Sequence, residues 1–353
     1  MKIGIVTVYE AANFGSYLQA FALFQTLKNM GHDVYFIKND HPDVPYKRQF
    51  YKYPINRRSI KHPLAVFREY REGREKCRLF QKEVKKLPVI EFSKIDELDK
   101  IILGSDEIWN VTMRCFTSSF YFGAGMHDLV TYAVSVGKAS VEDFEQYPEL
   151  VDDMIKIDKI LVRDENSRKV VTEFTKKNVQ IVCDPTFLVP LSCLKTNILD
   201  EYIKNNRYIL IYSYPGYISD SIKENIIRFA CEEGLKIVSA CFSMDWCDYM
   251  LNCSPLEFCE AIRYAEYVFT TTFHGSIVSL LNHKQFVATP SGIKVSDVLK
   301  RVGLSEVIID KKLDYKEFTY LLKNVHHDYS AVDSKIKEMR RHGLEELKKV
   351  INS

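Results

Sequence analysis

Residues Lys2–Ile37 decide the fold, and they read KIGIVTVYEAANFGSYLQAFALFQTLKNMGHDVYFI. The continuous apolar run in Lys2–Tyr9 is typical of a parallel strand that is buried on both faces. After a polar loop, Ser16 is placed to cap a helix that ends before Gly31. Val34–Ile37 has the pattern of a second strand. This stretch therefore predicts a strand–helix–strand unit with two parallel strands.

The same alternation of strand and helix patterns continues along the chain. The further strands that we expect are Lys100–Leu103, Leu129–Val136, Lys159–Val162, Val179–Cys183, Tyr208–Tyr212, Lys236–Ala240, Tyr267–Thr271 and Phe286–Thr289. Residues 188–207 are rich in asparagine and are interpreted as a linker. We therefore predict an α/β protein with two Rossmann-like domains facing across a cleft. The first covers residues 1–187, with a basic insertion at about 46–88; the second covers 208–330; a helix over 331–353 follows.

Length and composition exclude several classes of protein. A chain of 353 residues suits two domains of ordinary size. Apolar residues make up 46% and charged residues 27%, which argues against a disordered or fibrous chain. No apolar run approaches the ~18 residues of a membrane span, and the N-terminus has the pattern of a strand rather than of a signal peptide. We expect a cytoplasmic protein.

Charge is unevenly distributed. The formal net charge is +2, but residues 46–88 contain 14 Lys/Arg against 4 Asp/Glu. One interpretation is a solvated helix face over Phe67–Lys86. The other is attraction to an anionic or membrane-linked substrate, with peripheral contact at the inner face of the membrane. Nucleic acid is not expected as a partner, because no nucleic-acid-binding motif accompanies the charge.

Neither the cysteines nor the paired histidines indicate a metal site. The nine cysteines include no C-x-x-C pair, and Cys241, Cys247, Cys253 and Cys259 recur every six residues, which suits no zinc site. We interpret them as free, mostly buried thiols. The pair His326–His327 has no third ligand nearby in the sequence. No metal is predicted.

In open α/β sheets, ligands bind beyond the carboxyl ends of the strands, so the chemistry is sought in the loops that follow them. The first such loop, Asn13–Gln19, combines a glycine with a helix start that suits an anion. Asn13 and Gln19 are candidates to bond sugar hydroxyls, with Gly15 and Ser16 beside them, although simple capping by Ser16 is the alternative. The absence of G-x-G-x-x-G argues against NAD or FAD.

The second loop, GSDEIWN, covers Gly104–Asn110. Asp106 is a candidate to orient or deprotonate a hydroxyl, and Trp109 to stack on a sugar face. Ser105 and Glu107 belong to the same group. The alternative is an aspartate cap with Trp109 packed below it.

Two further loops carry charged candidates. His274 stands between a strand and a helix, where it could act as a general acid or as a cationic anion ligand, with N–H groups from Gly275 and Ser276. Arg163 ends a strand, and its guanidinium matches phosphate or carboxylate; a salt bridge to Asp164, Glu165 or another acid is the alternative. Lesser candidates are Ser135, Gly137, Asp184 and Lys294.

Together these loops resemble one family, the polysaccharide pyruvyl transferases. The segments that carry the resemblance, in chain order, are NFGSYLQAFAL, GSDEIWN, TYAVSVGK, LVRDENS, VCDPTFLV and TTFHGSIVSL. Each match alone is weak, but six in the same order are specific. The departures from the family pattern are Glu107 for Gln, Val136 for Phe, Thr271 for Asp, Thr272 for Arg and Lys294 for Arg.

The resemblance implies a GT-B-like fold whose C-terminal helix returns to the N-terminal domain. It implies transfer of pyruvate from phosphoenolpyruvate to a sugar, usually as a cyclic ketal, with no metal or other cofactor required. His274 and Asp106 would be catalytic. Arg163, Gly275, Ser276 and Lys294 would bind the donor. The acceptor side or cleft would be lined by Asn13, Gly15, Ser16, Gln19, Ser105, Glu107, Trp109 and Ser135.

Three alternatives remain open at this point. A nucleotide-sugar glycosyltransferase could use the same architecture, since it also binds phosphate at helix starts. A related transferase could use another carboxylated donor. A non-catalytic module that binds glycans or nucleotides could keep the cleft and lack turnover, and Thr271 and Glu107 would be its signs.

Overall fold

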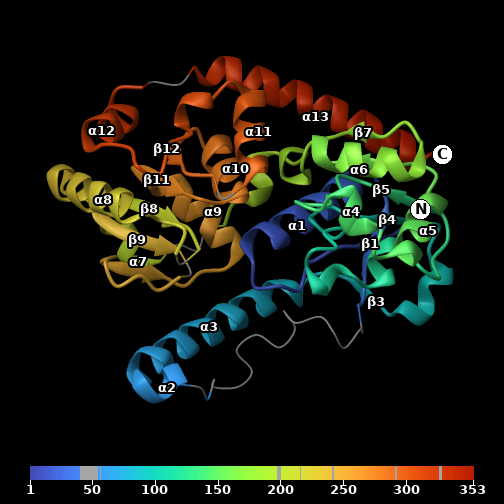
Figure 1. Cartoon of the computed structure of the whole chain (residues 1–353), viewed down its shortest axis with the longest axis horizontal. Coiled ribbons are helices and arrows are strands. Elements are labelled where there is room, and N and C mark those ends of the chain that lie inside the picture. The colour runs from blue at the N-terminus through green and yellow to red at the C-terminus, as the bar shows by residue number, and fades with distance from the viewer. Residues whose placement is uncertain are drawn as a thin grey trace. The chain divides into compact units, whose positions relative to one another are not determined.

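The computed structural model describes residues 1–39, 55, 57–196, 200–214, 216–240, 242–290, 292–325 and 328–353. The chain divides into two compact units, each built on a parallel sheet (Figure 1). Unit 1 comprises Met1–Arg48, Lys82–Pro190 and Lys337–Ser353; unit 2 comprises Gln49–Gln81 and Leu191–Ile336. Cys241 and the pair His326–His327 lie outside the described residues, as does much of the basic stretch before α2.

Unit 1 holds a five-stranded sheet in the order β3-β2-β1-β4-β5. Its strands are β1 (Lys2–Val6), β2 (Asp33–Ile37), β3 (Val89–Ile90), β4 (Lys100–Leu103) and β5 (Leu129–Thr131). A parallel pair, β6 (Leu161–Val162) and β7 (Gln180–Ile181), continues from β5 through the bridges Val130–Lys159 and Val134–Val162. The helices are α1 (Phe14–Asn29), α4 (Val141–Phe144), α5 (Pro148–Lys156) and α6 (Glu165–Thr175).

Unit 2 repeats the plan with the strand order β10-β9-β8-β11-β12. Its strands are β8 (Tyr208–Tyr212), β9 (Lys236–Ala240), β10 (Tyr249–Leu251), β11 (Tyr267–Thr270) and β12 (Gln285–Ala288). The helices are α7 (Glu201–Lys204), α8 (Asp220–Glu233), α9 (Pro255–Tyr264), α10 (Phe273–Leu281), α11 (Ile293–Val302) and α12 (Tyr315–Lys323). Short 3₁₀ turns in the two units cover Phe92–Glu97, Arg114–Phe116, Ser119–Phe122, Pro185–Phe187, Leu191–Leu194 and Ser305–Val307.

Alternation along β8 explains how the helices of unit 2 are distributed. Ile209 and Ile211 pack with Phe229 of α8 and Phe318 of α12. Tyr208 points to the other face, where its hydroxyl donates to the carbonyl of Ala261 in α9 at 2.6 Å. Since successive side chains of a strand face opposite ways, a strand without polar positions can be covered on both sides.

Two long helices cross the division of the chain. α3 (Pro63–Val84) follows the short α2 (Arg57–Lys61), and α13 (Tyr329–Ile351) contributes its part from Lys337 onward to unit 1. There the Nε of Arg340 donates to the carbonyl of Phe187 at 2.6 Å, and the Nζ of Lys100 donates to the carbonyl of Ser353 at 2.9 Å. The C-terminal helix thus returns to the N-terminal unit.

Most predicted strands are confirmed, but β1, β5, β6 and β7 are shorter than predicted, and β3 and β10 were not predicted. The predictions for Lys100–Leu103, Tyr208–Tyr212 and Lys236–Ala240 coincide with β4, β8 and β9. The predicted strand Leu129–Val136 ends at Thr131 because Ala133 has a left-handed φ of 53°. In the described parts of the chain, no helix is long and apolar enough to cross a membrane.

Candidate functional site

The loop between β1 and α1 begins the candidate site, and Asn13 organises it. Its Oδ1 accepts hydrogen bonds from the backbone N–H groups of Gly15 at 2.9 Å and Ser16 at 3.3 Å. Asn13 therefore caps α1, which corrects the prediction that Ser16 is the cap. The helix begins two residues before Ser16, and the serine hydroxyl is left for another partner.

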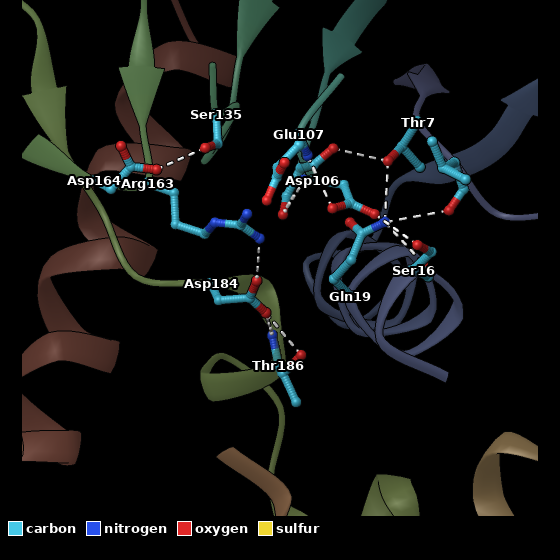
Figure 2. A network of polar contacts seen from close by, with 12 residues as sticks. Thr7, Ser16, Gln19, Asp106, Glu107, Ser135, Arg163, Asp164, Asp184 and Thr186 are labelled. Atoms are coloured by element: carbon cyan, nitrogen blue, oxygen red, sulfur yellow. Dashed lines mark hydrogen bonds and ion pairs between the residues drawn. The ribbon is translucent and has the colours of Figure 1, made fainter. Parts of the chain in front are cut away.

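That partner is Asp106, at the carboxyl end of β4 (Figure 2). The hydroxyl of Ser16 donates to Oδ2 of Asp106 at 2.7 Å, and the backbone N–H of Glu107 donates to Oδ1 at 2.8 Å. Both oxygens of the carboxylate are thus held, one by the first turn of α1 and the other by the backbone of its own loop. Asp106 is only partly buried and has a left-handed φ of 76°. Residues held in sparsely populated backbone regions concentrate at functional sites.

A buried layer supports this loop from below. Nε2 of Gln19 donates to Oγ1 of Thr7 at 3.0 Å and to the carbonyl of Ser16 at 2.8 Å. The hydroxyl of Thr7 donates to the carbonyl of Ser105 at 2.9 Å. Gln19 and Ser105 are fully buried. We predicted that Gln19 contacts a sugar; in the structure its side chain instead supports the loop from below. Thr7, which sequence analysis missed, is the last polar residue of the strand pattern before the loop.

Trp109 is also placed differently from the prediction. Its side chain is 0% exposed, its ring stacks on Phe122 at 5.4 Å, and its Nε1 donates to the carbonyl of Tyr121 at 2.9 Å. No face of the indole is open to a sugar. The alternative from sequence analysis, Trp109 packed below the loop, is confirmed.

A second carboxylate centre lies between β5 and α6. Asp164 caps α6 by accepting from the backbone N–H of Ser167 at 2.8 Å, and its Oδ2 accepts from the hydroxyl of Ser135 at 2.6 Å. Ser135 is buried, and its Oγ in turn accepts from the N–H of Gly137 at 3.0 Å. The backbone N–H of Ser135 donates to the carbonyl of Asp106 at 2.9 Å. The segment that carries Ser135 therefore lies between the Asp106 centre after β4 and the Asp164 centre after β6.

Glu107 and Gly137 meet within this region. The carboxylate of Glu107 accepts from Nδ2 of Asn110 at 2.8 Å. Gly137 has a left-handed φ of 61°, and a Cβ added to it would lie 2.6 Å from Oε2 of Glu107 and would also strike Asn110. The glycine is required here by close approach as well as by backbone conformation.

Arg163 forms a buried ion pair. Its Nη1 lies 3.0 Å from Oδ2 of Asp184, and the two side chains are 4% and 0% exposed. The other oxygen of Asp184 accepts from the backbone N–H and the hydroxyl of Thr186 at 3.0 and 2.7 Å. The salt-bridge alternative describes this geometry, with Asp184 as the acid (Figure 2). Donor binding by Arg163 stays a prediction.

The candidate residues of unit 2 follow the adjacent strands β11 and β12. Thr272 caps α10, and His274 is 8% exposed in its first turn. The hydroxyls of Ser213 and Thr271 lie 2.8 Å apart and connect the loop after β8 to the loop after β11. Lys294, partly buried, lies in the first turn of α11 after β12. These side chains gather at the carboxyl edge of the second sheet.

Two predicted anion ligands are already engaged. The N–H of Gly275 donates to Oγ1 of Thr272 at 3.0 Å, and the N–H of Ser276 donates to the carbonyl of Thr272 at 3.1 Å. Both N–H groups are therefore used in capping α10, and donor binding by Gly275 and Ser276 stays a prediction. Gly275 also has a packing role, because an added Cβ would strike the side chains of Thr270 and Thr272.

Sequence analysis also missed an aromatic surface after β8. Tyr214 and Tyr217 are 37% and 46% exposed, and their ring centroids lie 6.1 Å apart. Tyr214 also contacts Phe242 at 5.3 Å. The sequence signal was the pair of tyrosines on either side of a Pro–Gly dipeptide that follows a predicted strand. In the described residues, no group of three His, Cys, Asp or Glu side chains could hold a metal ion.

Comparison with protein families now adds a decisive observation. The model for polysaccharide pyruvyl transferases matches residues 13–291, the greater part of the chain. The chain belongs to the polysaccharide pyruvyl transferase family. The resemblance found in the sequence is confirmed, and membership supports a transferase that acts in polysaccharide modification with a sugar acceptor. No curated protein matches the sequence.

Solved structures similar to this pyruvyl transferase family member support the fold. UDP-GlcNAc 2-epimerase from Neisseria meningitidis is 10% identical with a TM-score of 0.53, covering 99% of this chain and 100% of that one. The enzyme of the same name from Methanocaldococcus jannaschii is 11% identical with a TM-score of 0.51, covering 97% and 100%. The trehalose-6-phosphate synthase OtsA is 11% identical with a TM-score of 0.51, covering 98% and 96%. The predicted α/β, GT-B-like fold class is confirmed.

Proposed function

We propose that this protein transfers the pyruvyl group of phosphoenolpyruvate to two hydroxyls of one sugar, in a cell-surface polysaccharide or its precursor. The observation that carries the proposal is the family match over residues 13–291, together with six family motifs in order. The acceptor would be a sugar, lipid-linked or anionic. The product would be a cyclic pyruvate ketal.

The proposed reaction balances without a redox partner or cofactor. A proton adds to the methylene carbon of phosphoenolpyruvate, and C2 gains oxocarbenium character. One sugar hydroxyl attacks C2 and loses its proton, and the C2–O bond to phosphate breaks. The second hydroxyl then attacks C2, loses its proton and closes the ring. Of the two hydroxyl protons, one replaces the proton used at the methylene carbon and the other leaves with phosphate.

Within unit 2, we assign the acid role to His274 and part of donor binding to Lys294. Imidazolium can deliver a proton near neutral pH, and an ammonium is a point charge suited to phosphate. Help of this kind from a general acid is worth about 10²–10⁴-fold in rate.

Within unit 1, we assign the orientation or deprotonation of a hydroxyl to Asp106. Both of its oxygens accept hydrogen bonds, so the carboxylate is fixed in direction before any substrate arrives. Such preorganisation is what a general base requires. Tyr214 and Tyr217 are proposed to stack on the acceptor sugar, the role for which Trp109 is too deeply buried.

The first experiment measures thermal unfolding with millimolar phosphoenolpyruvate, with UDP-sugars and inorganic phosphate in parallel. Ligands that bind only the folded state raise its stability with the logarithm of their concentration. We expect a saturable rise with phosphoenolpyruvate that is larger than the rise with phosphate and is lost in His274→Asn. His283→Asn is the matched control, because His283 is an exposed histidine of the same unit, paired with Asp333. A rise with a UDP-sugar alone would contradict the donor assignment.

A further inference from the structure

The region formed by α2 and the start of α3 exposes large apolar side chains. Ile60 is 76% exposed, Leu64 is 85% exposed and Phe67 is 55% exposed. Leu64 and Phe67 are three residues apart in α3, so they lie on the same face of the helix. Val66, on the opposite side, is buried. Single exposed apolar residues are ordinary, but three within eight residues form a patch that indicates an interaction.

Cations border this apolar patch. Residues 57–74 contain six Lys/Arg against two Asp/Glu. Arg57, Lys61 and Arg71 have exposed side chains. Arg68 forms a salt bridge to a neighbouring loop, with its Nη2 2.9 Å from Oδ1 of Asp245, and it is therefore left out of the surface defined next. We name the set Ile60, Leu64, Phe67, Arg57, Lys61 and Arg71 the apolar–cationic surface.

We propose that the apolar–cationic surface docks on an anionic lipid bilayer. Interfacial helices combine Lys/Arg with large apolar side chains that enter the boundary between headgroups and acyl chains. Positive side chains next to an anionic membrane add to this attraction, and the partner must be of opposite charge to the surface.

The chemistry of the surface favours lipid over other partners. A soluble polyanion offers ion pairs to the cations but leaves Ile60 and Leu64 in water. A second copy of the chain meeting through the same surface would bring like charges together. A bilayer with anionic headgroups satisfies both the charges and the apolar side chains. The proposal does not depend on the identity of the donor.

The test is co-sedimentation of the full chain with vesicles of phosphatidylcholine, with and without phosphatidylglycerol. We expect binding to the anionic vesicles that weakens as salt is added, since screening shortens the reach of surface charges. Arg57→Gln/Lys61→Gln/Arg71→Gln should lower partitioning by about 100-fold, from about fivefold for each cation near an anionic surface. Ile60→Ser/Leu64→Ser should lower it at least about tenfold, through loss of buried apolar area.

Matched controls change the same chemistry elsewhere in unit 2. Lys311→Gln/Lys312→Gln/Lys316→Gln removes three exposed charges, and Tyr320→Ser removes an exposed apolar side chain. Both should bind vesicles like the natural chain. Equal loss in the two triple variants would overturn the proposal, because net charge alone would then explain binding.

Three other results would also overturn it. The first is no binding of the natural chain to anionic vesicles at low salt. The second is vesicle binding that is unchanged in Ile60→Ser/Leu64→Ser, together with binding of heparin as tight as that of the vesicles. That result would indicate a soluble polyanion as the partner. The third is a dimer, detected by light scattering, that Leu64→Ser dissociates without any effect on vesicle binding. Unfolding temperatures of all variants confirm that each is folded.

Discussion

Asp106 shows how a residue that the sequence singles out acquires its geometry from distant parts of the chain. Its left-handed backbone conformation is uncommon for a residue with a side chain, though aspartate tolerates it better than most. The conformation is accompanied by hydrogen bonds from Ser16, 90 residues away, and from the next residue, Glu107. The sequence identified the carboxylate, and tertiary contacts gave it a direction.

At the same scale, we predict that Arg163→Ala is strongly destabilising. It leaves the carboxylate of Asp184, which is 0% exposed, without its ion-pair partner. Removing one member of a buried pair costs about 3–5 kcal/mol of unfolding free energy. Arg341→Ala, which removes an exposed pair with Glu345, should change it little. Chemical denaturation measures both; equal midpoints would contradict the buried pairing.

The buried pair also affects how a role of Arg163 in donor binding can be tested. A loss of phosphoenolpyruvate binding in Arg163→Ala would be confounded by unfolding. Arg163→Lys keeps the positive charge opposite Asp184, and it loses the planar fork that suits a carboxylate or phosphate. A folded Arg163→Lys protein that no longer responds to phosphoenolpyruvate would support a direct role for the guanidinium.

Cysteine reactivity is a second prediction for single residues. Burial raises the pKa of the Cys247 thiol to about 12, whereas Cys231 is exposed. The thiolate is the reactive form, so a raised pKa lowers its fraction at a given pH. At pH 8, iodoacetamide should label Cys231 readily and Cys247 hardly at all, as measured by peptide mass spectrometry. Labelling in denaturant is the control, and similar rates for the two native thiols would show the prediction to be wrong.

At the scale of elements, the candidate site depends on loops that follow parallel strands. β4 lies between β1 and β5 in the sheet, so the loops after the three strands converge on one edge, although β4 and β5 begin 98 and 127 residues after the start of β1. The shortening of β5 at Ala133 directs the chain into the loop that carries Ser135 and Gly137. The point at which each strand ends therefore determines where the polar side chains of the following loop lie.

Gly137 offers a matched test of this loop. Gly137 and Gly234 have nearly the same left-handed φ, 61° and 64°, but an added Cβ meets Glu107 and Asn110 only at Gly137. Gly234→Ala should cost about 1–2 kcal/mol for the backbone conformation alone. Gly137→Ala should cost more, because the side chains of Glu107 and Asn110 must also move. Urea unfolding of the two variants measures the difference; an equal cost would remove the packing argument.

At the scale of the whole molecule, α13 joins the last residues of the chain to the first unit. Arg340 donates to the carbonyls of Phe187 and Val189, and Lys100, which is buried, donates to the carbonyl of Ser353. Gly343 lies so close to Tyr132 that an added Cβ would be 2.7 Å from its hydroxyl. The N-terminal unit is therefore completed by the C-terminus.

Removal of residues 337–353 should lower the stability of unit 1. The deletion exposes apolar surface of unit 1, and it removes the carbonyl groups to which the ammonium group of Lys100 donates hydrogen bonds. In a Trp246→Phe background, Trp109 is the single tryptophan and reports on unit 1 alone. We expect its emission to change at a clearly lower temperature than in the full chain. Arg341→Lys on the exposed side of α13 is the control, and an unchanged midpoint after the deletion would contradict the prediction.

The sequence by itself determined the fold class, the family and the residue types at the strand ends, because each is encoded locally. Buried strands show as apolar runs, and motifs such as GSDEIWN and TTFHGSIVSL occupy consecutive positions. Only the tertiary structure decided which of these side chains are buried and which are paired. Trp109 and Gln19 stand in motif segments and yet are fully buried, and Arg163 is paired with Asp184, 21 residues away. Exposure and pairing depend on what other segments bring alongside, so spacing along one loop does not contain them.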